Sequence, residues 1–133
     1  MSEVKRVMPL PEEMVMIRDA ILIPHMIAMV EKSMNEIQNS PNVLKRAYAM
    51  TAQAIMDKLM ADQFGLRREL SARNIKLYLE NPETNNTRHI INYKYIYRGY
   101  HHEFGIVREV MRSEISVQLA RYITDIGEGL RRK

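Results

Sequence analysis

The sequence predicts a single α+β domain that is mostly helical, with two long N-terminal helices, one β-hairpin and one C-terminal helix. Residues 14–30 are dense in apolar side chains, and apolar side chains recur at helical spacing over 44–70 and 104–126. Between these segments, residues 75–80 and 89–98 alternate with the two-residue period of strands. A chain of 133 residues can bury about two thirds of its unfolded surface, so one core is sufficient. Residues 1–10 and 128–133 are expected to be flexible ends.

The first helix is expected to run from about residue 11 to residue 37. Pro11 suits the first helical turn, where Glu12 and Glu13 would lie near the positive end of the helix dipole. Pro24 lies well inside this segment and removes a backbone hydrogen bond, so we expect a kink or break near residues 22–24. Residues 14–23 are apolar on nearly all sides, which predicts that the helix is covered on more than one side.

The second helix is expected to begin with Ser40 as its cap and Pro41 as its first residue. It can continue to Ala72, although Gly65 makes a bend or break reasonable. Its predicted apolar face consists of Leu44, Tyr48, Ile55, Leu59, Leu66 and Leu70.

The two predicted strands, 75–80 and 89–98, form a hairpin with a long polar connection. Gly99 would end the second strand. Successive strand residues point to opposite faces, so the hairpin would have an apolar face and a polar face. The face expected to pack against a helix carries Ile75, Leu77, Leu79, Ile91, Tyr93, Tyr95 and Tyr97. The opposite face of the second strand carries Asn92, Lys94, Ile96 and Arg98.

The last helix is expected to begin near Glu103 and to end at Gly127 or Gly129. The triplet His101-His102-Glu103 would then form the turn into this helix. Its predicted apolar stripe is Phe104, Val107, Met111, Ile115, Leu119, Tyr122 and Ile126.

The net charge of +4 comes entirely from residues 65–98, because the basic and acidic residues of the remaining chain cancel. Five of the seven tyrosines lie in or beside the same segment. Basic side chains among aromatic rings are typical of proteins that bind single-stranded nucleic acid. The alternative is that the tyrosines belong to the core and the charges keep a sheet edge soluble. The candidate nucleic-acid-binding residues are Arg67, Arg68, Arg73, Lys76, Lys94 and Arg98.

Motifs for catalysis and for cofactor binding are missing from the sequence. It contains no cysteine, Gly-rich phosphate loop, nucleophile elbow or HExxH motif. The side chains of His101 and His102 diverge on a helix or a strand, and His89 can join them only through the fold. We therefore expect no catalytic site, no metal and no cofactor. We also expect a cytoplasmic protein without a membrane span, because charged residues and Pro24 interrupt the most apolar segment.

Eleven methionines, eight of them in the first two helices, favour helix packing and adaptable partner surfaces. The leading expectation is a small interaction or regulatory protein without enzymatic activity that forms a homodimer through its first helix. The residues proposed for this interface are Met14, Ile17, Ile21, Met26, Met29 and Val30. The alternative function is a nucleic-acid-binding regulator that uses the basic segment 65–98.

Overall fold

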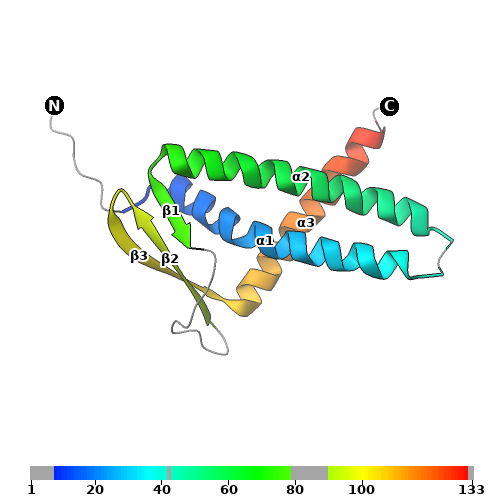
Figure 1. Ribbon diagram of the computed structural model, residues 1–133, viewed down its shortest axis with the longest axis horizontal. Helices are drawn as coiled ribbons and strands as arrows, with labels where there is room; N and C mark the ends of the chain where they lie inside the picture. Colours follow the sequence, from blue (N-terminus) through cyan, green and yellow to red (C-terminus); the bar gives the residue numbers. More distant parts are fainter. Residues whose placement is uncertain (1–7, 42, 79–89, 132–133) are drawn as a thin grey trace.

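The computed structural model describes residues 8–41, 43–78 and 90–131, and it confirms the predicted fold class. The chain forms three helices and one antiparallel sheet (Figure 1). The helices are α1 (Pro11–Gln38), α2 (Lys45–Ala72) and α3 (Arg108–Arg131). The strands are β1 (Ile75–Tyr78), β2 (Ile90–Tyr97) and β3 (Tyr100–Val107), arranged in the order β1-β2-β3.

Helices α1 and α2 form a long antiparallel hairpin, and the sheet lies against the end where α1 begins and α2 ends (Figure 1). Each helix is continuous through the residue expected to interrupt it, Pro24 in α1 and Gly65 in α2. Helix α2 begins at Lys45 rather than Pro41, because residues 43–44 form the turn that reverses the chain. Its first intrahelical bond runs from the Tyr48 N–H to the Leu44 carbonyl at 3.0 Å.

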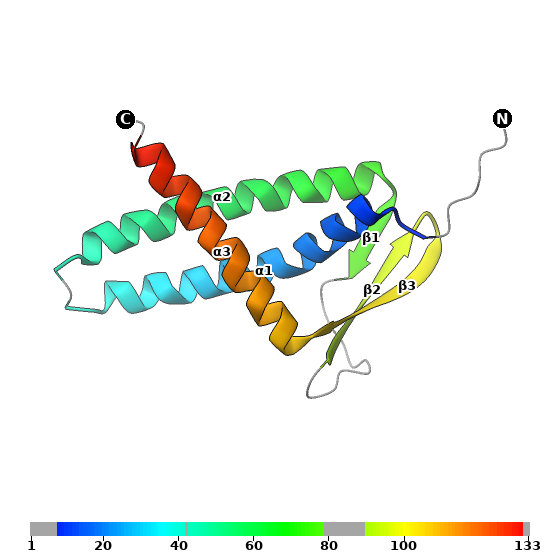
Figure 2. The same cartoon turned by 180° about the vertical axis from the view of Figure 1, so that it is seen from behind.

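The predicted apolar face of α2 is buried only where other elements reach it. Ile55, Leu59 and Leu70 belong to the core, and Leu66 packs against it. Leu44 and Tyr48 are exposed, contrary to the prediction. Both lie near the tip of the helical hairpin, which extends beyond the sheet and beyond most of α3 (Figures 1 and 2).

The third strand is the main difference from the sequence prediction. Residues 100–107 pair with β2, so the helix expected from Glu103 begins five residues later, at Arg108. Phe104 and Val107 therefore belong to the sheet. The cause is the two-residue turn Arg98-Gly99, in which φ is +50° and +90°. Two consecutive residues with positive φ match the right-handed twist of a hairpin, so the chain returns directly beside β2.

The expected pairing of the first two strands is confirmed over the described residues, with Ile75 opposite Tyr97 and Leu77 opposite Tyr95. Leu79, Glu80 and the connection through residue 89 lie outside the described residues. The predicted division of faces is also confirmed. Tyr93, Tyr95 and Tyr97 are buried, whereas Lys94 and Arg98 are exposed.

Helix α3 crosses the helical hairpin diagonally on the side seen in Figure 2. Its buried residues are Met111 and Ile115, and Leu119, Tyr122 and Ile126 pack against the core. Polar contacts fix the crossing, because Gln118 donates to Asp19 of α1 at 3.1 Å and Tyr122 donates to Asp62 of α2. The helix continues past Gly127 and Gly129 to Arg131, so it includes most of the segment expected to be a flexible end.

Candidate functional site

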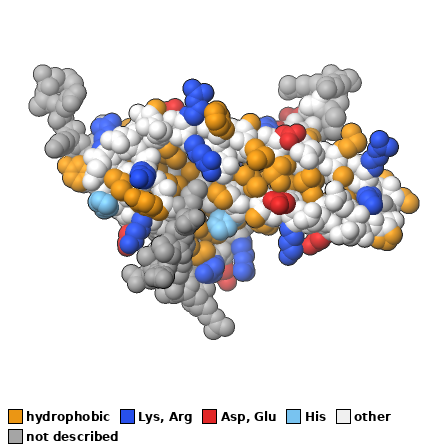
Figure 3. Space-filling view, in the orientation of Figure 1, with side chains coloured by type: hydrophobic (Ala, Val, Ile, Leu, Met, Phe, Trp, Pro, Cys, Tyr) orange, Lys and Arg blue, Asp and Glu red, His pale blue; other side chains and the backbone are white. Residues whose placement is uncertain are grey.

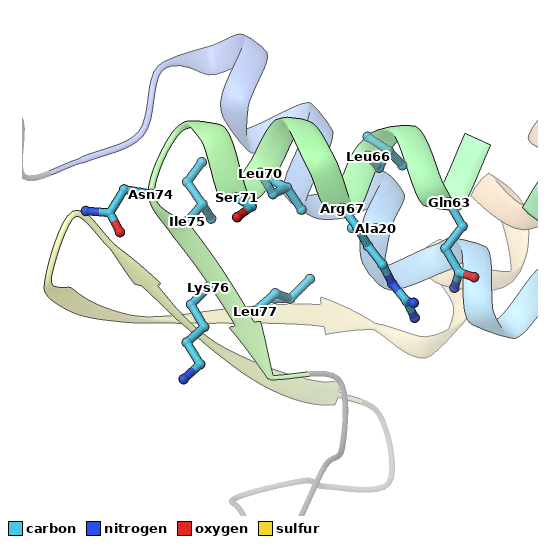
Figure 4. Close-up of a pocket in the computed structure, with 10 residues that line it drawn as sticks. All are labelled: Ala20, Gln63, Leu66, Arg67, Leu70, Ser71, Asn74, Ile75, Lys76 and Leu77. Atoms are coloured by element: carbon cyan, nitrogen blue, oxygen red, sulfur yellow. The ribbon is translucent and has the colours of Figure 1, made fainter. Parts of the chain in front are cut away.

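A groove lies between the C-terminal half of α2 and strand β1, with a volume of about 420 Å³ (Figure 4). The two elements diverge after the bend at Asn74, which leaves a wedge between them. Asn74 allows this bend because asparagine tolerates the left-handed region, here with φ at +59°. The lining residues are Ala20 from α1, Gln63, Leu66, Arg67, Leu70 and Ser71 from α2, and Asn74, Ile75, Lys76 and Leu77 around β1.

The groove combines an apolar floor with positive charge. Leu66, Leu70, Ile75 and Leu77 are the large apolar residues of this lining. Arg67 extends from α2 on one side of β1, and Lys76 extends on the other side (Figure 4). Among the described residues that line the groove there is no carboxylate. An anionic ligand with apolar parts therefore matches this surface in both charge and polarity.

Arg73 has a structural role next to the groove. Its guanidinium contacts Glu69 of α2 at 2.9 Å and reaches both Glu12 and Glu13 of α1 at 3.5 Å. These contacts join the end of α2 to the beginning of α1. Arg73 was among the candidate nucleic-acid-binding residues, but three carboxylates already share its charge.

Glu13 is a buried carboxylate that joins three segments, and the sequence indicated only a first-turn charge for it. One of its oxygens accepts hydrogen bonds from the Leu10 N–H and from the Tyr97 hydroxyl, both at 2.9 Å. Burial alone would raise the pKa of Glu13. The hydrogen bonds from Leu10, Tyr97 and Arg73 outweigh burial and hold the pKa below its ordinary value. Glu13 therefore stays ionised in the core and attaches β2 to α1.

The other two buried tyrosines also reach α1, through weaker partners. The Tyr95 hydroxyl lies 3.7 Å from the sulfur of Met14, and the Tyr93 hydroxyl lies 3.0 Å from Nε2 of His25. Burial lowers the pKa of His25 and raises the pKa of Tyr93, although the charge of Arg108 acts against the rise in Tyr93. The row of tyrosine rings is thus core packing, and it leaves no ring of β2 free to stack on a base.

The remaining candidate cations do not converge with the groove. Lys94 lies opposite Glu103 on the outer face of the sheet. The guanidinium of Arg98 lies 5.5 Å from the ring centre of Tyr97, and that of Arg68 lies 5.8 Å from the ring centre of Phe64. Only Arg67 and Lys76, of the six predicted cations, line the groove.

The triplet His101-His102-Glu103 lies in β3 instead of forming a turn. The His102 ring stacks on Tyr95 with their centres 5.1 Å apart, while His101 and Glu103 face outwards. His89 lies outside the described residues. Within residues 8–41, 43–78 and 90–131, no three His, Asp or Glu side chains are grouped as metal ligands would be.

A family model described as "YhjD protein" matches residues 8–127 of the chain. The chain belongs to this family. The match includes all of α1, α2 and the sheet, and hence every residue that lines the groove. No curated protein and no solved structure matches the chain.

Four of the six residues proposed for a dimer interface are core residues of this YhjD family member. Ile17, Ile21, Met26 and Val30 are buried within the chain itself. Met14 is partly buried, and Met29 is exposed. On the face seen in Figure 3, apolar side chains gather over the helical hairpin. The large apolar residues exposed on α2 include Met50, Met60 and Phe64.

None of the described helices combines the length and the apolar character that crossing a bilayer requires.

Proposed function

We propose that the protein is a non-enzymatic interaction protein that binds an acidic, partly apolar segment of a partner protein in the groove between α2 and β1. The observation that supports this most is the presence of Arg67 and Lys76 beside an apolar floor, with no carboxylate among the described lining residues. The proposed class of function, a protein-interaction protein, is the one expected from the sequence. The proposed contact surface is the groove between α2 and β1 instead of the first helix. The reason is that most of the proposed dimer residues lie in the core.

Binding of nucleic acid has weaker support from the arrangement of the side chains. Proteins that bind single strands combine exposed rings with a continuous track of cations. Here the rings of Tyr93, Tyr95 and Tyr97 are buried, and Arg73 is bound to carboxylates. Two cations over an apolar floor suit a carboxylate-bearing peptide better than a phosphate chain.

The test measures the affinity of a fluorescein-labelled peptide of alternating glutamate and valine by fluorescence anisotropy. We expect the double variant Arg67→Glu/Lys76→Glu to bind at least about tenfold more weakly, which is about 1.4 kcal/mol, because two attractive charges become repulsive. The double variant Arg68→Glu/Lys94→Glu is the matched control, since it changes the net charge by the same amount and both residues are exposed but do not line the groove. Equal losses in the two variants would show that only net charge matters and would refute the site.

A single-stranded oligonucleotide is the competing ligand in the same assay at low salt. Tight oligonucleotide binding together with no peptide binding would favour the nucleic-acid hypothesis instead. Circular dichroism of each variant verifies that the helices are intact.

A further inference from the structure

Strand β1 lies at an edge of the sheet, and its backbone has a defined orientation there. It pairs with β2 on one side only within the described residues. The Arg98 N–H donates to the Asn74 carbonyl at 2.9 Å, so Asn74 and Arg98 form a hydrogen-bonded pair. In an antiparallel ladder the direction of the backbone groups alternates. Lys76 therefore directs its N–H and C=O towards β2, while Ile75 and Leu77 direct theirs towards the open edge.

This open edge borders the groove already described. Ile75 and Leu77 of β1 line it together with Leu66 and Leu70 of α2 (Figure 4). A sheet edge with unpaired N–H and C=O groups is a template for another strand. The groove thus offers backbone hydrogen-bonding groups and an apolar wall, with Arg67 on one side of β1 and Lys76 on the other.

We propose that a partner peptide binds as an added antiparallel strand along β1, with apolar side chains towards α2 and acidic side chains towards Lys76. This inference rests on the function proposed above and specifies how the acidic segment binds. Side chains of an added strand would alternate between the two faces of the sheet. Those on the inner face would meet Leu66, Leu70 and Arg67, and those on the outer face would lie beside Lys76. The peptide class is an extended segment in which apolar and acidic residues alternate.

The alternative is that the charge of Lys76 keeps this edge from pairing with another strand. The two accounts differ in the backbone chemistry that binding requires. In an antiparallel addition, the peptide residues that exchange hydrogen bonds with Ile75 and Leu77 have side chains on the same face as these two residues. In the alternating peptide these are the valines.

The experiment compares two N-methylated forms of the alternating glutamate and valine peptide with the unmodified peptide. We expect methylation of the valine nitrogens to weaken binding about tenfold or more, because each methyl group removes a donor to β1. Methylation of the glutamate nitrogens should leave the affinity within about twofold, because those N–H groups point away from β1. Equal effects of the two modifications would overturn strand addition.

Amide hydrogen exchange of the protein is the second readout. Saturating peptide should slow the exchange of the Ile75 and Leu77 N–H groups, while the Lys76 N–H, already paired with β2, should change little. Slow exchange of Ile75 and Leu77 in the free protein would show an occupied edge and would overturn the inference.

The two proposals fail in different ways. Peptide binding that depends on Arg67 and Lys76 but is indifferent to N-methylation would retain the groove and reject the added strand. No binding of the unmodified peptide at millimolar concentration would reject both proposals.

Discussion

The Tyr97→Phe substitution tests whether the buried carboxylate of Glu13 holds the sheet against the helices. The Tyr97 side chain is fully buried, and its hydroxyl donates to Glu13 at 2.9 Å. A hydrogen bond to a charged group contributes about 1.5–3 kcal/mol to stability. Glu13 keeps its bonds from Leu10 and Arg73 in the variant, so we expect a loss of about 2 kcal/mol. If the unfolding free energy falls by about 2 kcal/mol per molar urea, the urea concentration at the midpoint of unfolding should fall by about 1 M.

The matched control is Tyr95→Phe, which makes the same chemical change on the same face of the same strand. Among the described residues, the Tyr95 hydroxyl has the sulfur of Met14 as its polar contact, at 3.7 Å, and sulfur is a weak acceptor. We expect a loss of about 0.5 kcal/mol or less. Urea denaturation followed by circular dichroism measures both losses. If the two variants lose equal stability, the reasoning about Glu13 is refuted.

The same comparison has an expected pH dependence. The pKa of Glu13 is lower in the folded protein than in the unfolded chain. Its contribution is therefore complete above the unfolded pKa of about 4.5 and is lost as the pH falls through the folded value. The difference between Tyr97→Phe and Tyr95→Phe should shrink over this acidic range, because a protonated Glu13 is a weaker acceptor.

Backbone freedom at two glycines and the partly buried His25 give further predictions. Gly65→Ala should raise the unfolding free energy by about 0.5–1 kcal/mol, because the added Cβ meets nothing within 4 Å in the interior of α2. Gly99→Ala should lower the unfolding free energy by about 1 kcal/mol, because φ is +90° at this position. Urea denaturation measures both changes, and destabilisation by Gly65→Ala would contradict the account of α2. Burial lowers the pKa of His25, so the unfolded chain binds a proton at higher pH, and stability should fall as the pH drops below about 6.5. His25→Gln should remove this part of the pH dependence, and an unchanged slope would show that His25 is not its source.

The division of the β2 faces could be predicted because it depends only on the two-residue period of a strand. Tyr93, Tyr95 and Tyr97 had to share a face, and their size and apolar rings favoured the core. The helical hairpin was predictable for a similar reason, since helical spacing of apolar residues is a local property.

The third strand could not be predicted because residues 104–111 satisfy two periods at once. Phe104, Val107 and Met111 have helical spacing, whereas Phe104 and Ile106 alternate with more exposed neighbours as strand residues do. The backbone turn at Arg98-Gly99 decides between them, because it places the following residues beside β2. A single glycine indicated a strand end but did not indicate that the chain would return.

The contacts of Glu13 and the groove were beyond sequence reasoning for a different reason. Glu13 meets Tyr97 across 84 positions of the chain, and no local pattern indicates which tyrosine would reach it. The groove arises from the angle between α2 and β1, which depends on the bend at Asn74. Arg67 and Lys76 were identified as cations, but their apolar neighbours Leu66 and Leu70 were assigned only to a helix face.

The small contact that the described part of β1 offers limits how long a partner held there would stay bound. The four described residues of β1 span about 13 Å, and among them Ile75 and Leu77 present their backbone groups to the edge. Four hydrogen bonds and a small apolar contact give a modest free energy of binding once the entropic cost of ordering the peptide is subtracted. Such a contact dissociates quickly, so a partner bound only here would bind and dissociate repeatedly. A long-lived complex would require a second binding contact with the same partner.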